Sequence, residues 1–143
     1  MFDLENCLAF ITNKTTKNLN EVFNDKLVAK GSTRVQWTAL FYLGKYEGIS
    51  QIELCQLMEI KPSTMARLID RLEANGFVER EKNSKDRRTI KLELTEEGKK
   101  MREKLLPEGI AFSETITKNI TEEELKVFLK VLETMGQNVS ENL

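Results

Sequence analysis

Residues 49–98 read ISQIELCQLMEIKPSTMARLIDRLEANGFVEREKNSKDRRTIKLELTEEG and contain the signals for two short helices, a tight turn and a hairpin. Ser50 and Glu53 form a capping box, in which each side chain accepts a hydrogen bond from the other residue's backbone amide. Leu54, Leu57 and Met58 then give one apolar face to the helix that follows. This part of the chain is therefore expected to pack as a short amphipathic helix.

A second helix is expected to begin at Pro62, because the amide hydrogen that proline lacks would be unpaired at the first helical position. Gly76 suits the left-handed residue that follows the end of such a helix. Between these two residues, apolar side chains repeat at helical spacing and charged side chains fill much of the rest: Met65, Leu68, Ile69 and Leu72, with Arg67, Asp70, Arg71 and Glu73. Only residues 58–61 separate the two helices, which predicts a helix-turn-helix.

After Gly76 the pattern changes from helical to alternating. Residues 77–82 and 89–94 each place apolar and charged side chains on opposite faces, as strands do, and the polar residues 83–88 between them suit an exposed tip. The expected fold is therefore mostly α with a small β-hairpin wing, a winged helix-turn-helix.

These elements resemble the MarR family (multiple antibiotic resistance regulators) of bacterial and archaeal transcription factors. The resemblance lies in S-T-x-x-R-L-I-D-R-L-E-x-x-G-F-V-x-R at residues 63–80, D-R-R at 86–88 and L-T-x-x-G at 94–98. It extends over essentially the whole chain, because long helical segments flank the winged part on both sides, as they do in the family. The resemblance implies a regulator that binds double-stranded DNA as a homodimer.

The length of 143 residues suits a single domain, residues 1–143, and no apolar run is long enough to cross a membrane. Asp3 and Glu5 place acids where a signal peptide needs basic residues. The two cysteines lie far apart in the sequence and do not indicate a disulfide framework. The simplest expectation is a cytoplasmic protein without a membrane partner.

Charge is unevenly distributed along the chain. Residues 61–104 contain 13 Lys and Arg against nine Asp and Glu, a net charge of +4, whereas the remaining residues contain nine against 14, a net charge of −5. Positive charge is therefore concentrated on the predicted winged part, as a DNA-binding element requires. The alternative interpretation, a solvated charged surface, suits residues 96–104 better than the hairpin tip at 85–88.

Helical segments are expected on both sides of the winged part. Apolar spacing predicts a helix over residues 4–28, and capping boxes at Thr33 with Gln36 and at Thr121 with Glu124 begin two others. Thr95 caps a further helix, which Pro107, followed by Gly109, should kink or interrupt before a helical segment resumes over 110–120.

The resemblance divides the chain by role. Residues 1–31 and 107–143 form the helical dimerisation region, and residues 33–106 form the winged helix-turn-helix, with the wing at 77–94. Apolar stripes on long helices must be buried somewhere, either against a second subunit or within a monomer. A twofold dimer would place two reading helices about 34 Å apart along DNA, which predicts a pseudo-palindromic operator.

The expected DNA contacts lie on the second helix and the wing. Ser63 and Thr64 lie at the helix N-terminus, whose dipole favours phosphate, and Arg67 lies one turn further, placed to bind guanine through two hydrogen bonds. Arg71 is a further candidate, with pairing to Asp70, Glu73 or a phosphate as alternatives. The full set of expected contacts is Lys61, Ser63, Thr64, Arg67, Arg71, Ser84, Lys85, Asp86, Arg87 and Arg88.

Within this set, the wing residues have separate expected roles. Arg87 and Arg88 match the family's wing motif, so one of them is expected to enter the minor groove, with Asp86 orienting them. Lys61, Ser84 and Lys85 are expected to bind phosphates, which anchors the protein without reading sequence.

Many family members release DNA when a small aromatic or phenolic effector binds. Phe10, Phe23, Trp37 and Phe41 are candidates to line such a pocket, and an ordinary core is the alternative. Cys7 raises the alternative of oxidant sensing, but no cationic residue is adjacent to it in sequence to lower its pKa, and Cys55 suits a small packing residue. With no histidine and two separated cysteines, no zinc site is expected.

Other classes of function are weakly indicated. The chain has no histidine for a Ser-His-Asp device and no glycine-rich phosphate loop, so neither an enzyme nor a cofactor is expected. The alternative function is a winged-helix module that binds protein without specific DNA binding. DNA affinity that falls steeply with salt distinguishes the two. Repression is the default for the family. No motif in the sequence identifies the operator, the regulated genes or the effector.

Overall fold

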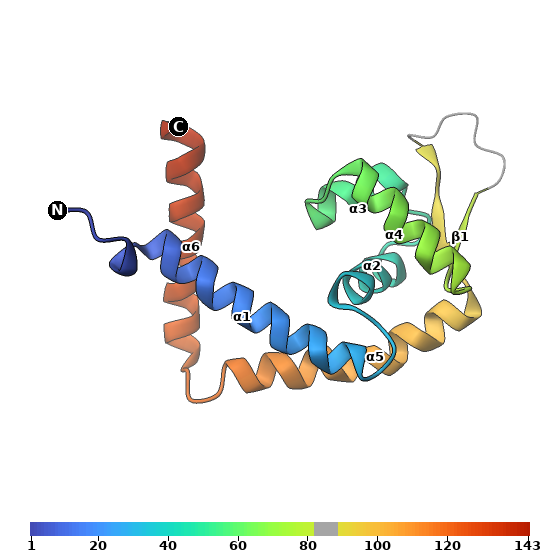
Figure 1. Ribbon diagram of the computed structural model, residues 1–143, viewed down its shortest axis with the longest axis horizontal. Helices are drawn as coiled ribbons and strands as arrows, with labels where there is room; N and C mark the ends of the chain where they lie inside the picture. The colour runs from blue at the N-terminus through green and yellow to red at the C-terminus, as the bar shows by residue number, and fades with distance from the viewer. Residues whose placement is uncertain (82–88) are drawn as a thin grey trace. The chain divides into compact units, whose positions relative to one another are not determined.

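The computed structural model describes residues 1–81 and 89–143. In chain order they form η1 (Leu4–Asn6), α1 (Leu8–Val28), α2 (Arg34–Lys45), α3 (Gln51–Met58), α4 (Pro62–Ala74), β1 (Val78–Arg80), β2 (Leu92–Leu94), α5 (Glu96–Ile116) and α6 (Glu122–Asn142) (Figure 1). Contacts group these elements into two units, Met1–Ile110 and Ala111–Leu143. The winged helix-turn-helix lies in the first unit, and the fold is mostly α with one small hairpin, as predicted.

The local signals of the helix-turn-helix are confirmed. The Ser50 hydroxyl accepts from the amide of Glu53 at 3.1 Å, and the Glu53 carboxylate accepts from the amide of Ser50 at 2.9 Å. Pro62 begins α4, and Gly76 follows its end with a φ of +77°. The amide of Phe77 then donates to the carbonyl of Leu72, which closes the helix end before the chain enters the wing.

The turn between α3 and α4 depends on a residue that the sequence did not mark. Glu59 adopts the left-handed conformation with a φ of 51°, and its amide donates to the carbonyls of Cys55 and Gln56. A side chain with a β-carbon is strained there, since left-handed backbone costs L-residues about 1–2 kcal/mol.

Glu59→Gly is therefore expected to stabilise the protein by about 1 kcal/mol, because glycine adopts a positive φ without that strain. Urea unfolding followed by circular dichroism measures the change. Asn119 has a φ of 63° and provides the control. Asparagine tolerates this conformation, so Asn119→Gly should give a smaller gain. An equal or larger gain from Asn119→Gly would contradict the explanation.

In the described part of the wing, the two strands are shorter than the alternating pattern predicts. β1 and β2 pair antiparallel over three residues each, with Val78 opposite Leu94 and Arg80 opposite Leu92. The segment before α3 joins the other edge of β2: the Gln51 amide donates to the Ile90 carbonyl, and the Leu92 amide donates to the Ile49 carbonyl. The base of the wing, here β1 and β2, is therefore fastened directly to the start of the helix-turn-helix.

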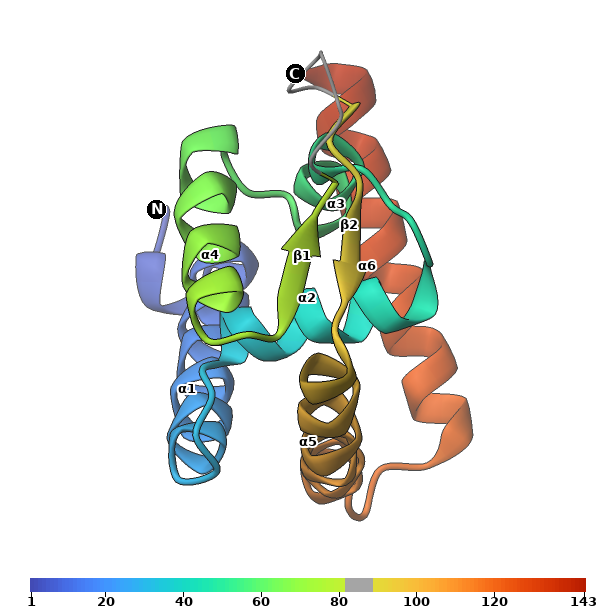
Figure 2. The ribbon, with the colours of Figure 1, turned by 90° about the vertical axis from the view of Figure 1, so that its right-hand side faces the viewer.

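The core of the first unit lies beneath α4. Figure 1 shows α2 between the helix-turn-helix and α5, and Figure 2 shows both strands beside α4. The innermost side chains come from these elements and from α1, and they include Leu27, Leu40, Leu54, Met65, Ile69, Leu72, Val78, Leu92 and Leu105. The apolar face of α4 predicted from its spacing is buried, which leaves the opposite face exposed.

Of the two outcomes predicted at Pro107, a kink or an interruption, the interruption is wrong, since α5 runs continuously through this residue and ends at Ile116. Proline removes one backbone hydrogen bond from a helix, and packing on both sides can offset that loss. Leu105 is fully buried, and Gly109 allows the Trp37 ring to lie where a side chain would otherwise be. The helix is thus held against α2 across the proline.

The second unit contains the end of α5 and the whole of α6. α6 begins at the predicted capping box, in which Thr121 and Glu124 each accept from the other's amide. Large apolar side chains of α6 remain exposed, among them Val127, Phe128 and Leu129. Within residues 1–81 and 89–143, the helices are too short or too polar to cross a membrane.

Candidate nucleic-acid interface

The N-terminus of α4 is open to solvent. Lys61 is its cap residue and, in the described part of the chain, makes no capping hydrogen bond through its side chain. Pro62 has no amide hydrogen, while the amides of Ser63 and Thr64 lie in the first turn, where the helix itself provides no acceptor. Lys61, Ser63 and Thr64 are all exposed. This end of the helix has the geometry that attracts a phosphate.

Arg67 and Arg71 lie one turn apart on α4, and both are exposed. The buried face of the same helix is formed by Met65, Leu68, Ile69 and Leu72. The packing of that apolar face holds the helix rigidly, so that the two arginines point away from the core. An exposed helix that presents arginines next to an uncapped N-terminus can bind phosphates and base edges.

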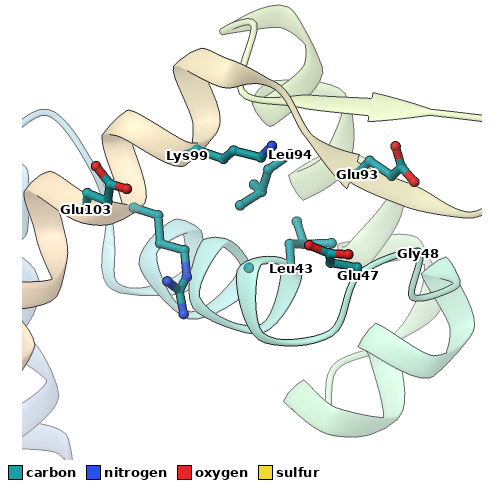
Figure 3. A pocket seen from close by; sticks show the side chains of 9 residues that line it. Leu43, Glu47, Gly48, Glu93, Leu94, Lys99 and Glu103 are labelled. Atoms are coloured by element: carbon teal, nitrogen blue, oxygen red, sulfur yellow. The ribbon is translucent and has the colours of Figure 1, made fainter.

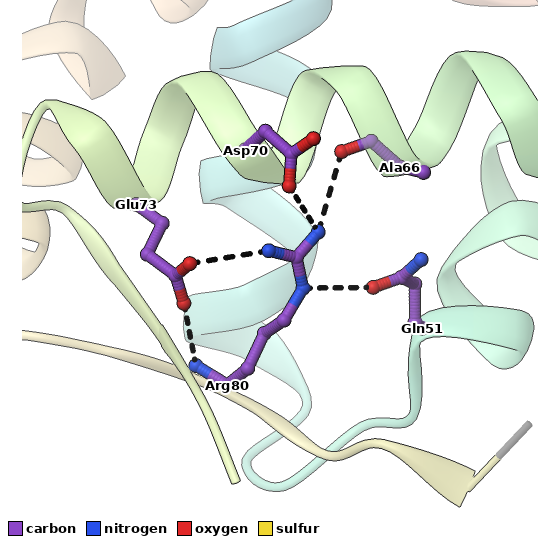
Figure 4. A network of polar contacts seen from close by, with 5 residues as sticks. All are labelled: Gln51, Ala66, Asp70, Glu73 and Arg80. Atoms are coloured by element: carbon purple, nitrogen blue, oxygen red, sulfur yellow. Dashed lines mark hydrogen bonds and ion pairs between the residues drawn. The ribbon is translucent and has the colours of Figure 1, made fainter. Parts of the chain in front are cut away.

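The two acids on α4 bind Arg80 of β1 and do not serve as partners for Arg71 (Figure 4). Arg80 Nη2 lies 2.8 Å from Asp70 Oδ1, and Arg80 Nη1 lies 3.1 Å from Glu73 Oε1. Arg80 Nε also donates to Gln51 Oε1 at 3.3 Å. Pairing Arg71 with these acids is therefore not supported.

Arg80 was not predicted as a site residue, although its position in the strand indicates that it needs a charged partner. Val78 and Arg80 share one face of β1 because side chains alternate along a strand, and Val78 is buried. A charged residue on the inward face of a strand needs a partner, because an unpaired buried charge is costly. That partner could have been sought on the preceding helix.

Five expected DNA contacts, Ser84, Lys85, Asp86, Arg87 and Arg88, lie outside the described residues. The described residues on either side are Glu81, whose amide donates to the carbonyl of Lys91, and the segment from Thr89 into β2.

Three of the four aromatic residues predicted for an effector pocket pack together. The rings of Phe23 and Trp37 meet edge to face with centroids 5.1 Å apart, and Trp37 stacks on Phe41 at 5.9 Å. Arg102 of α5 lies over the Phe41 ring at 5.3 Å and donates to its backbone carbonyl. Phe10 lies apart, in an exposed hollow along α1. The three rings form part of the packing between α1, α2 and α5.

A hollow of about 410 Å³ lies between α2, β2 and α5. Figure 3 shows Glu47 and Glu93 at one end of it and Glu103 at the other, with Lys99 and Leu94 between them. Its lining, within the described residues, includes none of the four predicted aromatic residues. Three carboxylates against Lys99 and Arg102 leave this lining with a net charge of −1, so the hollow attracts a DNA phosphate less than the exposed face of α4 that carries Arg67 and Arg71.

The two cysteines differ in their surroundings. Cys55 is buried within the helix-turn-helix, and this burial raises the pKa of its thiol, so less of it is the reactive thiolate at neutral pH. Cys55 therefore acts as the small packing residue that the sequence predicted. Cys7 is half-buried at the start of α1 and forms no disulfide.

The family model for MarR proteins matches residues 32–90, which include α2, the helix-turn-helix and β1. The chain is 29% identical over 127 residues to the HTH-type transcriptional repressor YetL of Bacillus subtilis, covering 87% of this chain and 76% of YetL. The chain therefore resembles the MarR family over residues 32–90. It is also 35% identical over 101 residues to the repressor MdtR of the same organism, covering 71% of the chain and 65% of MdtR.

Solved structures of MarR-family proteins have the same fold. A MarR-family transcriptional regulator from Silicibacter pomeroyi superposes with a TM-score of 0.76 at 27% identity, covering 96% of this chain and 92% of that one. The S. aureus MepR–DNA complex superposes with a TM-score of 0.83 at 20% identity, covering 94% and 98%. Together with the family match, these likenesses identify the chain as a transcriptional regulator and not an enzyme.

Proposed function

We propose that this protein is a repressor that binds a pseudo-palindromic operator as a homodimer and is released by a small aromatic or phenolic molecule. The match to the MarR family model and the named relatives support the coarser function, a DNA-binding transcriptional regulator. The observation that carries the proposal is the exposed face of α4, where Arg67 and Arg71 follow an uncapped helix N-terminus. This helix would lie in the major groove, with the wing beside it.

Support for repression comes from relatives. YetL and MdtR are both named transcriptional repressors, and the matched MepR structure is a complex with DNA. A repressor acts by occupying its operator and needs no contact with another kind of protein. The basic face of α4 would provide the operator contacts. Support for an effector is the cluster of Phe23, Trp37 and Phe41 between the elements that hold the winged region.

Support for a homodimer comes from exposed apolar side chains on the flanking helices. On α1, Leu8 is 64% exposed, and on α6 Val127 and Leu129 are 60% and 63% exposed. Apolar side chains at helical spacing are normally buried, and a second copy of the same chain would bury both sets at once. Two copies would also supply the two reading helices that an inverted repeat requires.

The test uses DNA from the region beside the protein's own gene, chosen for an inverted repeat. Arg67→Ala should weaken binding to this duplex about 10- to 100-fold, because a bidentate arginine contact contributes about 1–3 kcal/mol. Fluorescence anisotropy over a range of salt concentrations measures the affinity, and sedimentation measures the stoichiometry, which should be two chains per operator. Arg87→Ala combined with Arg88→Ala should weaken binding as well.

Lys126→Ala is the matched control, since it removes one exposed positive charge from α6, outside the winged region. It should change affinity far less than Arg67→Ala. Wild-type affinity in both the Arg67 variant and the wing variant would refute the assigned contacts. If the unaltered protein bound the inverted repeat no better than random DNA, the alternative of a protein-binding winged-helix module would be favoured.

A further inference from the structure

Arg80 joins three elements through one side chain (Figure 4). Its guanidinium pairs with Asp70 and Glu73 of α4, donates to the Ala66 carbonyl of the same helix, and donates to Gln51 of α3. Its backbone amide, in β1, donates to the second carboxylate oxygen of Glu73 at 3.3 Å. A planar guanidinium with several donors in fixed directions is well suited to hold such an arrangement rigidly.

The partners of Arg80 lie along one flank of α4. Ala66, Asp70 and Glu73 are spaced four and three residues apart, so they share one side of the helix. The buried side chains Leu68 and Leu72 lie on another side of α4, and Arg67 is exposed. Arg80 therefore holds the base of the wing against the border of the face that carries the expected DNA contacts.

At the end of β1 away from Gly76, the base of the wing needs a contact that fixes its direction. β1 starts next to α4, where the Phe77 amide donates to the Leu72 carbonyl, and Arg80 is the last residue of the strand. The strand rises about 3.3 Å per residue, so three residues carry the chain roughly 10 Å from that attachment. A two-stranded ladder alone is marginally stable, so contacts with neighbouring segments must set its direction. On β2 these are the hydrogen bonds with Ile49 and Gln51, and on β1 they are the contacts of Arg80.

We propose that Arg80 is a positioning residue for DNA recognition: it fixes the direction of the wing relative to α4 and does not itself bind DNA. This inference rests on the proposed function. It explains why two acids lie on the helix that reads DNA. Asp70 and Glu73 hold the arginine in place, and their pairing with Arg80 limits their repulsion of phosphates.

The decisive variant is Asp70→Asn combined with Glu73→Gln, because two explanations predict opposite results for it. If the acids only repel DNA, removing two negative charges strengthens binding to every duplex. If they hold Arg80, binding to the operator weakens about tenfold, as for the loss of one base contact, while binding to a scrambled duplex stays equal or strengthens. The ratio of operator affinity to scrambled affinity should therefore fall.

The matched control is Glu96→Gln combined with Glu97→Gln. These acids pair with Lys99 and Lys100 in the first turn of α5, so the variant removes the same charge without affecting the Arg80 contacts. It should leave the affinity ratio unchanged. Arg80→Lys retains the charge but loses the planar fork, and it should lower the ratio as the Asp70 and Glu73 variant does. Circular dichroism at the assay temperature verifies that each variant is folded.

A second measurement separates positioning from direct contact. In Arg80→Gln, the slope of log affinity against log salt should equal that of the unaltered protein, whereas loss of a phosphate contact would reduce it by about one. An unchanged or higher affinity ratio in the Asp70 and Glu73 variant, or a reduced slope in Arg80→Gln, would overturn the inference. Failure of the unaltered protein to prefer its operator would instead refute the proposed function.

Discussion

Gly98→Ala is expected to destabilise the protein by about 3 kcal/mol, the upper end of the usual cost of overpacking. Gly98 is buried in the first turn of α5, and a β-carbon there would overlap the carbonyl oxygen of Phe77. That carbonyl cannot move freely, because it accepts from the Thr95 amide. The Thr95 hydroxyl in turn donates to the Gly76 carbonyl and accepts from the Gly98 amide. The added methyl group must therefore separate α5 from the start of the wing.

Gly136→Ala is the matched control for this substitution. Gly136 lies within α6, and a β-carbon there would meet no atom within 4 Å. Alanine favours the helix over glycine by about 1 kcal/mol, so this variant should be slightly more stable than the unaltered protein. Urea unfolding at one fixed protein concentration measures both changes. Equal stability of the Gly98 variant and the unaltered protein would contradict this close approach of α5 to Phe77.

Most of the helix-turn-helix could be predicted because its signals are local. A capping box needs two residues three apart, and Ser50 with Glu53 forms one as predicted. Pro62 and Gly76 act through their own backbone chemistry, so the start and end of α4 are also as predicted. Binary patterning identified the buried face of this helix. Signals of this kind involve residues that are close together in the sequence, so they can be recognised without a structure.

The interactions that were not predicted depend on how the chain packs in three dimensions. Arg80 lies 29 residues from Gln51 in the sequence, and no periodic pattern brings the two together. The left-handed backbone conformation of Glu59 was not predicted, because glutamate is not typical of that conformation. Pro107 is a strong breaker by local rules, yet packing of α5 on α2 overrides it. The wing contacts from Ser84 to Arg88 stay predictions, because they lie outside the described residues.

Leu72→Ala is expected to cost about 3 kcal/mol of stability, within the range of about 2–5 kcal/mol for a buried leucine truncated to alanine. Leu72 is completely buried on the core face of α4. The loss combines the transfer of apolar surface with the cavity left behind, because a well-packed core relaxes only partly. The substitution acts on the helix proposed to read DNA. Operator binding should therefore fail at a lower temperature than in the unaltered protein, while the affinity of the folded variant at low temperature changes much less.

Leu57→Ala and Leu72→Met show whether burial and volume account for that loss. Leu57 is 40% exposed at the end of α3, so its truncation leaves a smaller cavity and should cost less than about 1.5 kcal/mol. Leu72→Met nearly conserves volume and should also cost less than about 1.5 kcal/mol. Equal losses from Leu57→Ala and Leu72→Ala in urea unfolding would show that α4 is not anchored by its buried face. The rigid presentation of Arg67 and Arg71 depends on that anchoring, so their contribution to operator affinity would then need another physical basis.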